Sequence, residues 1–558
     1  MAYDYDANKL AYYLSDDGSS ELTFHAVYQA SKFFKYWLPF CRKFNVEPRA
    51  PHVYFSLDNV INGHGPSGRK FTQEHDTVKA KYEEMQELIA RVARLGKVPD
   101  DIRSEHKGFR EWDSKSRVSA LMSNAPLVLN VDCDMHSNNS KALRDAACFF
   151  LDPKEGHRIG YVQFPQSFGG ITENDLYANG VKRIYEIEFF GTNAHNGPMY
   201  AGTGSVHRRE SLNGRKYDPK VHIKLEDKSV QGSKSWNDLE VKAKDLTSCT
   251  FENGKLWGKE MGLMYGCAVE DVFTGLVLHS RGWQSVYCAP ERKAYLGLAP
   301  VNTNDTLIQH KRWSTGLLEI FVSDYCPWTN GIGKLKLGQL MCYSFYTLWA
   351  LWCLPMITYG LVLPLAMVND ISLFPKVSDP WFKVFAFLGI ASHLFSLGEL
   401  LWAKGTIKMW WNETRMWMMK GTSSYLFSVM VIILKTLGIS EAGFEITSKV
   451  IDEEALKRYK CEKMEFAVAS PMFIPPTALS LLHLFCLLKT ITTVMKVGIE
   501  ELDHMLLQVA ISAYVSLISL PLYEAMFLRK DKGRMPVYVT MYSVGIVIVL
   551  LYISSMLL

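Results

Sequence analysis

The chain has 558 residues, with 61 lysines and arginines against 57 aspartates and glutamates, so its formal charge at pH 7 is +4. Apolar residues make up 48% and charged residues 21%, which excludes a disordered chain, a coiled coil and a collagen-like repeat. The small net charge gives no reason to expect nucleic acid as a partner. The 11 cysteines lack metal-binding spacing, so they predict reduced thiols rather than a disulfide framework or a zinc site.

Strand-like runs that end in acidic residues mark the first part of the chain. Four strands are predicted, at 10–14, 125–131, 159–166 and 283–290. Helix-like stretches lie between them, the clearest at 22–44 and 76–95. This alternation predicts an α/β domain with a largely parallel sheet. Asp16 and Asp17 follow the first strand and Asp132 and Asp134 follow the second, at the strand ends where such sheets bind ligands.

The spacing of Asp132 and Asp134 has a chemical interpretation. Two carboxylates at alternate positions can hold a divalent cation that also contacts two phosphate oxygens, and Mg²⁺ and Mn²⁺ prefer such ligands. The same pattern also occurs as ordinary turn carboxylates, so the motif by itself leaves both interpretations open.

Two further motifs follow along the chain. Glu270 and Asp271 begin an amphipathic helix, where Asp271 serves either as a general base or as an electrostatic partner of the helix N-terminus. Gln309, Arg312 and Trp313 lie in the run QHKRW. A guanidinium can neutralise a departing diphosphate and an indole can stack on a sugar ring. The competing interpretation is a basic helix with a tryptophan at a membrane surface.

The last 220 or so residues contain runs of membrane-spanning length, which is about 20 helical residues. Five spans are predicted, at 339–367, 381–402, 472–492, 505–528 and 537–558. The loops at 403–470 and 529–536 are rich in lysine and arginine, whereas those at 369–380 and 493–504 hold one each. This alternation predicts that the two basic loops and the preceding domain face the cytosol.

The segment 405–440 is apolar but interrupted by charges, and it carries Trp410, Trp411 and Trp417. Such amphipathic, basic, tryptophan-rich segments lie in the plane of the membrane interface. A sixth span at 423–439 is the alternative, and it would reverse the alternation of the loops.

The order of the motifs resembles that of processive family-two glycosyltransferases. DDG, DCD, VEDVFTG and QHKRW precede the membrane spans in that order. The chain resembles the plant cellulose synthase-like proteins, group G or the related group E, from residue 1 to 558. The most specific stretches are YLSDDGSSELTF, SNAPLVLNVDCDM, GTGSVHRRE, QHKRWSTGLLEI, WWNETRMW and LYEAMFLRKD.

The resemblance implies a fold and a domain order. Residues 1–337 would form an α/β GT-A-like catalytic domain, incomplete in this chain, followed by an α-helical multi-pass membrane domain. That membrane domain would comprise two transmembrane helices in 338–402, a cytosolic interfacial helix and gating loop in 403–470, and three transmembrane helices in 471–558.

The resemblance also implies roles for the nucleotide-sugar side of the site. Asp16 and Asp17 would lie near the uridine and diphosphate of the donor. Asp132 and Asp134 would bind Mg²⁺ or Mn²⁺ and, through it, the diphosphate.

On the acceptor side, Asp271 would take the proton from the acceptor hydroxyl, with Glu270 beside it. Gln309 and Arg312 would hold the diphosphate, and Trp313 would flank the acceptor. A gating loop over the site would include Phe444, Thr447 and Lys449.

The implied function is a membrane-bound inverting hexosyltransferase that moves a sugar from a UDP-sugar to a growing β-linked cell-wall glycan. The resemblance places it in the Golgi or endoplasmic reticulum membrane with its catalytic domain facing the cytosol, and leaves a homo-oligomer open. Two alternatives remain: a single transfer from UDP-glucuronate to a triterpenoid aglycone, and an inactive homologue.

The chain departs from the family pattern in two places. Relatives carry two membrane spans and a further strand before the stretch that opens here, and they insert a strand and a lysine-bearing helix near residue 117. Both differences touch the nucleotide pocket, so the activity of this form is left open.

Overall fold

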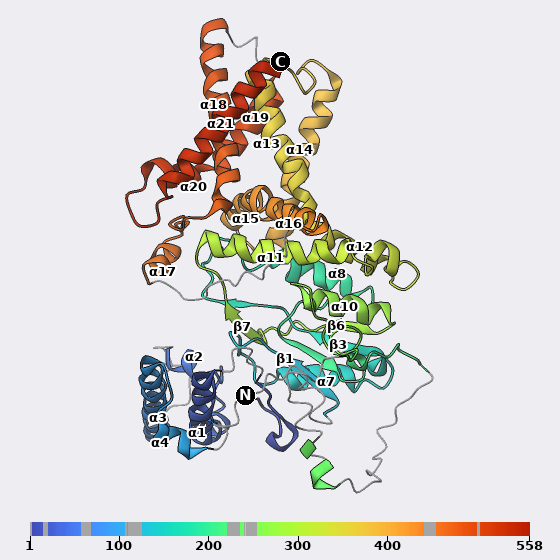
Figure 1. Ribbon diagram of the computed structural model, residues 1–558, viewed down its shortest axis with the longest axis vertical. Helices are drawn as coiled ribbons and strands as arrows, with labels where there is room; N and C mark the ends of the chain where they lie inside the picture. The colour runs from blue at the N-terminus through green and yellow to red at the C-terminus, as the bar shows by residue number, and fades with distance from the viewer. Residues whose placement is uncertain are drawn as a thin grey trace. The chain divides into compact units, whose positions relative to one another are not determined.

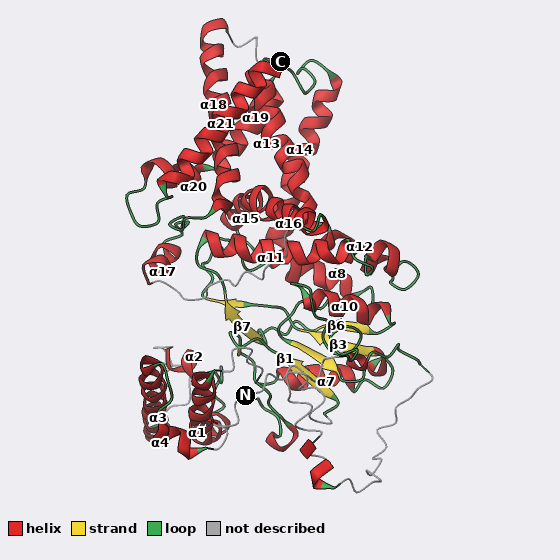
Figure 2. Cartoon of the chain, in the orientation of Figure 1, coloured by secondary structure: helices red, strands yellow, loops and turns green. Residues whose placement is uncertain are grey.

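The computed structural model describes residues 3–14, 20–56, 68–106, 109, 125–219, 235–238, 240–241, 254–439, 453–498 and 503–557. They form two compact units. The first comprises 1–167, 196–265 and 274–297, and the second comprises 168–195, 266–273 and 298–558. Figure 1 colours the chain from its N-terminus to its C-terminus. Figure 2 shows the strands in yellow and the helices in red.

The first unit begins with a group of helices. They are α1 (Glu21–Phe44), α2 (Pro51–Ser56), α3 (Arg69–Leu95) and α4 (Asp100–Glu105). Helices α1 and α3 pack side by side (Figure 1) around Trp37, which is fully buried. The indole N–H of Trp37 donates a hydrogen bond to the carbonyl of Arg49 at 3.0 Å. The helix predicted at 22–44 is therefore confirmed.

A four-stranded sheet forms the rest of the core of this unit. Its strands are β1 (Leu127–Asn130), β5 (Ser205–Arg208), β3 (Ile159–Gln163) and β6 (Gln284–Tyr287), in that spatial order. Strand β5 is antiparallel to both β1 and β3, and only the pair β3–β6 is parallel. The prediction of a largely parallel sheet is therefore wrong for the described strands. A buried apolar run looks the same in either direction, so periodicity finds strands without fixing their orientation.

The strand predicted at 10–14 does not form. These residues have no regular structure, and Tyr12 and Tyr13 are about half exposed, at 48% and 45%. A strand without a neighbouring strand leaves its backbone groups to water and gains no ladder hydrogen bonds.

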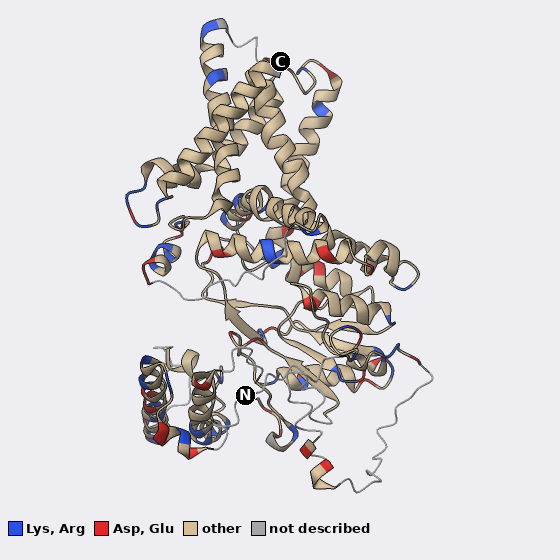
Figure 3. Cartoon of the chain, in the orientation of Figure 1, with Lys and Arg blue, Asp and Glu red and all other residues tan. Residues whose placement is uncertain are grey.

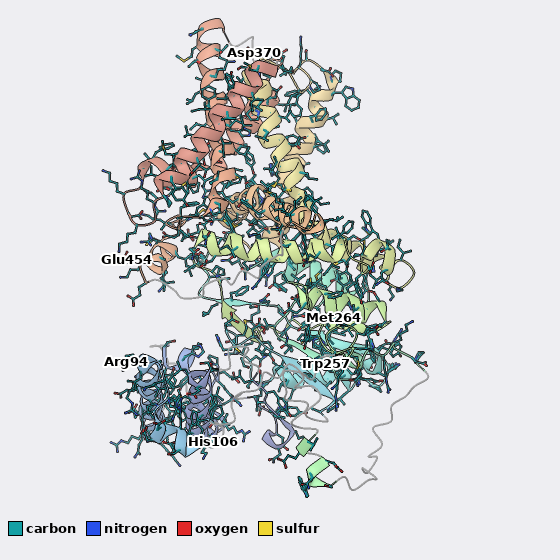
Figure 4. The ribbon with its side chains drawn as sticks, in the orientation of Figure 1. Arg94, His106, Trp257, Met264, Asp370 and Glu454 are labelled. Carbon is teal, nitrogen blue, oxygen red and sulfur yellow. The ribbon has the colours of Figure 1, made fainter. Side chains whose placement is uncertain are left out.

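The first unit contains further short elements. They include β2 (His136–Ser137), β7 (Tyr295–Leu298) and α7 (Ala142–Phe150). Strands β2 and β7 pair in antiparallel register. The segment that leads to α10 (Glu270–Ser280) is anchored by Met264, which is 2% exposed and donates its backbone N–H to Thr274 Oγ1 at 2.9 Å. Trp257, labelled with Met264 in Figure 4, donates its indole N–H to Tyr265 Oη at 2.9 Å.

The second unit is helical. Its longer helices are α11 (Thr303–Phe321), α12 (Leu337–Thr347), α13 (Cys353–Val368), α14 (Pro380–Trp402), α15 (Ile407–Met419), α16 (Leu426–Thr436), α17 (Glu453–Lys460), α18 (Ile474–Val497), α19 (Leu506–Ile518) and α21 (Val537–Leu557). Shorter ones are the π-helix η4 (Ile184–Glu188), α8 (Phe189–Asn193) and α20 (Leu520–Tyr523). Their shared core includes Leu307, Met416, Phe473, Leu522 and Met526.

Five helices of the described chain are long and apolar enough to cross a membrane. They are Trp349–Val368, Pro380–Trp402, Ile407–Thr436, Pro471–Lys496 and Val537–Met556. A sixth candidate is the pair Leu506–Ile518 and Leu520–Leu528, which is bent by 55°. Figure 3 shows few charged residues along α13, α18 and α21. The first span starts later than the apolar run at 339–367, because α12 ends at Thr347 and a separate turn begins at Trp349.

The helix Ile407–Thr436 differs from the other four. Just over half of its apolar window, 56%, is buried within the protein, against 6% to 33% for the others. In Figure 1 its parts α15 and α16 run across the direction of α13, α18 and α21, and α16 packs against α11. This arrangement favours the interfacial interpretation of 405–440, which stays a prediction.

Candidate functional site

A tight turn beyond β1 carries the two aspartates of the DCD motif. The backbone N–H of Asp132 donates to Thr203 Oγ1 at 3.0 Å, and the N–H of Met135 donates to the Asp132 carbonyl at 3.0 Å. Asp132 is exposed and Asp134 is half-buried. The turn therefore fixes the backbone of both residues while leaving carboxylate surface accessible to a ligand.

This carboxylate pair fits a divalent cation that takes its remaining ligands from substrate and water. No group of three or more His, Cys, Asp or Glu side chains placed to hold a metal ion occurs among the described residues, so a cage made of protein ligands alone is not formed there. Mg²⁺ commonly binds through one or two carboxylates and completes its shell with substrate phosphates and water. Asp132 and Asp134 match that mode.

Asp271 lies in the first turn of α10. Its side chain is half-buried, and its Oδ1 accepts the backbone N–H of Val272 at 2.8 Å, while Glu270 beside it is exposed. Burial, together with the negative charge of Asp271, raises the pKa of the Tyr185 hydroxyl above its usual range. The motifs in the sequence gave no signal for Tyr185, which lies in η4, far from Asp271 along the chain.

Helix α11 carries the three candidate residues of the QHKRW motif. Its N-terminus is capped by Asn302, whose Oδ1 accepts the N–H of Asp305 at 2.8 Å, an arrangement that satisfies an otherwise unpaired helix N–H. Gln309 is buried, whereas Arg312 and Trp313 are half-buried. Arg312 and Trp313 therefore each keep part of their surface exposed.

His310, the second residue of the QHKRW motif, carries no positive charge at neutral pH. It is 3% exposed, and burial together with the nearby Lys420 holds its pKa well below the usual range. The imidazole is neutral at pH 7, so only Arg312 and Lys311 of this motif carry positive charge. Its ring instead packs against Trp313, with centroids 4.9 Å apart.

Hydroxyl groups fix α11 against the helix Ile407–Thr436. Ser428 Oγ lies 2.7 Å from Ser314 Oγ and 3.0 Å from Thr315 Oγ1, and it donates to the carbonyl of Lys311 at 2.9 Å. All three hydroxyl-bearing residues are buried. These buried hydrogen bonds therefore join α11 to the neighbouring helix.

The two units divide the candidate residues between them. Asp132 and Asp134 belong to the first unit, whereas Glu270, Asp271, Gln309, Arg312 and Trp313 belong to the second. The second unit thus contains both the predicted base and the predicted diphosphate and acceptor residues. Asp16, Asp17, Phe444, Thr447 and Lys449 lie outside the described residues.

Comparison with known proteins identifies the family. The family model described as "Cellulose synthase" matches residues 1–116, 104–245 and 221–556. "Cellulose synthase-like protein E1" of Oryza sativa subsp. japonica is 38% identical over 606 aligned positions, which cover 98% of this chain and 81% of the relative. "Quillaic acid 3-O-glycosyltransferase CSL1" of Saponaria officinalis is 30% identical over 96% of this chain and 84% of its own length.

A cellulose synthase proper is also similar. "Cellulose synthase A catalytic subunit 2 [UDP-forming]" of Arabidopsis thaliana is 29% identical over 98% of this chain and 62% of its own length. Glycosyltransferases of this family generally use a divalent metal, in agreement with the carboxylate pair after β1. With the helices of membrane-spanning length, these similarities show that the chain is a membrane protein of the cellulose synthase family.

Proposed function

We propose that this protein transfers a sugar from a UDP-sugar to a β-linked glycan of the plant cell wall, with inversion at the anomeric carbon. The observation that carries the proposal is the position of Asp271 at the start of α10 in the same compact unit as the QHKRW helix and the candidate membrane helices. Such a reaction needs a base for the acceptor hydroxyl, a guanidinium for the diphosphate and an indole for the acceptor sugar. A polymer product also needs an exit through the bilayer.

In the proposed reaction, Asp271 accepts the proton of an acceptor hydroxyl. The hydroxyl oxygen forms a bond to the anomeric carbon as the bond to the UDP oxygen breaks on the opposite face, and UDP leaves with the electron pair. Arg312 and Gln309 bind the diphosphate, and Arg312 offsets the charge that gathers on it. Trp313 provides the face on which the acceptor sugar stacks, and Glu270 lies beside the acceptor.

The divalent cation, Mg²⁺ or Mn²⁺, would be held by Asp132 and Asp134 and would supply positive charge next to the diphosphate when bound. Asp16 and Asp17 are proposed to contact the nucleotide, and Phe444, Thr447 and Lys449 to belong to a gating loop over it. These assignments stand on the motifs.

The test is a transfer assay on membranes that contain the full chain, with radiolabelled UDP-glucose and other UDP-hexoses. Asp271→Asn should reduce turnover at least a hundredfold, since general base catalysis contributes about 10²–10⁴. Asp324→Asn is the matched control, because Asp324 is an exposed carboxylate on the same unit. Turnover of Asp271→Asn close to that of the control would show that Asp271 is not the general base.

A second candidate function is supported by one relative. "Quillaic acid 3-O-glycosyltransferase CSL1" covers 96% of this chain, and its name describes transfer to a triterpenoid rather than to a polymer. Incubation with labelled UDP-glucuronate and a triterpenoid aglycone separates the two proposals. A single-sugar conjugate supports the second, and a product that β-glucanase digests supports the first.

We also propose that the catalytic residues face the cytosol in the Golgi or endoplasmic reticulum membrane. The supporting observation is the basic loop at 529–536, with Arg529, Lys530, Lys532 and Arg534, because cytosolic loops are enriched in such residues. Protease treatment of sealed microsomes should cleave a tag placed before residue 20 without detergent. Protection of that tag would show that the proposed cytosolic orientation is wrong.

A further inference from the structure

Gly316 lies in the interior of α11, where a glycine destabilises a helix by about 1 kcal/mol relative to alanine. The residue is buried, and a β-carbon added to it would lie 2.9 Å from the backbone nitrogen of Val269 and 2.9 Å from Val269 Cγ2. Only glycine therefore permits the chain just before α10 to approach α11 this closely. A helical glycine with such a neighbour has a packing reason.

Cys267 makes a second contact at the same place. Its Sγ donates to the carbonyl of Gly316 at 3.5 Å. Burial, with the negative charges of Glu319, Asp271 and Glu270, raises the pKa of this thiol to about 12, so it remains a neutral donor at pH 7. The contact joins the loop before α10 to the backbone of the QHKRW helix through a hydrogen bond as well as through van der Waals packing.

Val269 is hydrogen-bonded to the first turn of α10. The N–H of Phe273 donates to the Val269 carbonyl at 3.1 Å, which is the first backbone hydrogen bond of the helix. Asp271 lies between these two residues, so its backbone cannot shift independently of Val269. Its side chain has little freedom either, because Oδ1 accepts the adjacent Val272 N–H.

We infer that Cys267, Val269 and Gly316 form a clasp that positions the carboxylate of Asp271 relative to Arg312 and Trp313 on α11. This inference rests on the proposed function for its catalytic consequence, and on the contacts above for the clasp itself. Alignment of a base with its substrate contributes strongly to rate, and a displacement of about 1 Å can cost about a hundredfold. The three residues act through Asp271, so they are positioning residues.

The experiment compares Gly316→Ala with Gly389→Ala in the full chain, purified in detergent. Gly389 is a matched control, because it lies inside α14 and a β-carbon there would meet no atom within 4 Å. The first readout is the rate at which Cys267 reacts with N-ethylmaleimide, followed by mass spectrometry. Exposed Cys133, Cys148 and Cys461 serve as internal references for a fully accessible thiol.

The clasp predicts that Gly316→Ala increases alkylation of Cys267 at least tenfold while the three reference thiols react as in the wild type. It also predicts a fall in kcat of about tenfold or more, with the KM for the UDP-sugar unchanged, because the donor residues on α11 stay in place. The control Gly389→Ala should change neither quantity.

Substitution of the cysteine tests the hydrogen bond separately. Cys267→Ser keeps a donor and should retain most of the wild-type kcat, whereas Cys267→Ala removes the donor and should lower kcat several-fold at constant KM. Equal kcat values for the two variants would show that this hydrogen bond does not help to position Asp271.

The outcomes separate this inference from the proposed function. Suppose that Gly316→Ala has the same Cys267 alkylation rate and the same kcat as the control Gly389→Ala, while Asp271→Asn is inactive. The clasp is then wrong and the proposed function stands. If the wild type transfers no sugar from any UDP-hexose, the proposed function fails, and the alkylation rates alone still decide whether the contact holds the loop before α10 against α11.

Discussion

The imidazole of His310 packs edge-on against the indole of Trp313, with ring centroids 4.9 Å apart and planes inclined by 68°. His310 is fixed in turn, because it is buried and its ring also lies 6.4 Å from that of Trp349. The orientation of the proposed acceptor-binding indole therefore depends on the neighbouring imidazole within the same motif.

His310→Phe should retain transfer activity, and His310→Ala should raise the KM for the acceptor up to about tenfold. The reason is that an aromatic pair contributes about 0.5–1.5 kcal/mol, and 1.4 kcal/mol corresponds to a tenfold change in binding. Steady-state kinetics with varied acceptor and saturating donor checks this. A phenylalanine variant as weak as the alanine variant would show that the ring contact does not orient Trp313.

Asp134→Asn should abolish most of the stabilisation that UDP and Mn²⁺ together give the protein. A ligand that binds only the folded state at 100 times its dissociation constant adds about 2.7 kcal/mol to the free energy of unfolding, and loss of one carboxylate weakens the proposed cation site. Thermal unfolding with and without UDP and Mn²⁺ measures the difference. Asp238→Asn is the control, since Asp238 is an exposed carboxylate in the same unit, and an unchanged shift in Asp134→Asn would contradict the assignment.

The stability of the first unit should fall as the pH decreases below about 6.5. Burial lowers the pKa of His207 and of His279 from 6.5 to about 3. Between these two pH values the unfolded chain binds a proton at each residue and the folded chain does not, so their contribution is complete above 6.5 and is lost as the pH falls towards 3. Each imidazole contributes a slope of up to about 1.36 kcal/mol per pH unit.

Unfolding followed from pH 7 to pH 5 should therefore have a shallower slope in His279→Gln than in the wild type. His157→Gln is the control, because His157 is exposed and lies in the same unit, and its slope should equal that of the wild type. Equal slopes in all three proteins would mean that His279 takes up a proton while folded.

Gly197→Ala should strongly destabilise the first unit. The backbone of Gly197 has a φ of +102°, and a β-carbon there would clash with the carbonyl oxygen and side chain of Ser285. Backbone strain of about 1–3 kcal/mol then adds to the displacement of β6, so a loss of at least about 3 kcal/mol in the free energy of unfolding is expected. Yield and unfolding temperature of the purified variant give the measurement.

Gly254→Ala is the control that separates backbone strain from the steric clash of a β-carbon with Ser285. Gly254 has a φ of +71°, but a β-carbon there would meet nothing within 4 Å, so this variant should fold with a small loss. A Gly197→Ala protein as stable as Gly254→Ala would contradict the tight contact with Ser285.

The sequence by itself identified the strands at 159–163 and 284–287, the long helix at 21–44 and the apolar helices of the second unit. Each of these depends on a local pattern of apolar and polar residues, which can be read along a single segment. The acidic, glutamine, arginine and tryptophan residues of the motifs were found in the same way, through their spacing along the chain.

Only the tertiary structure decided the direction of β5 between β1 and β3, the absence of a strand at 10–14, and the contacts of Tyr185, Cys267 and Gly316 near Asp271. These features join segments far apart in the chain, and apolar periodicity within one segment contains no information about which distant segment it meets or in which direction. A glycine, a cysteine and a tyrosine became informative once packing placed them near the start of α10.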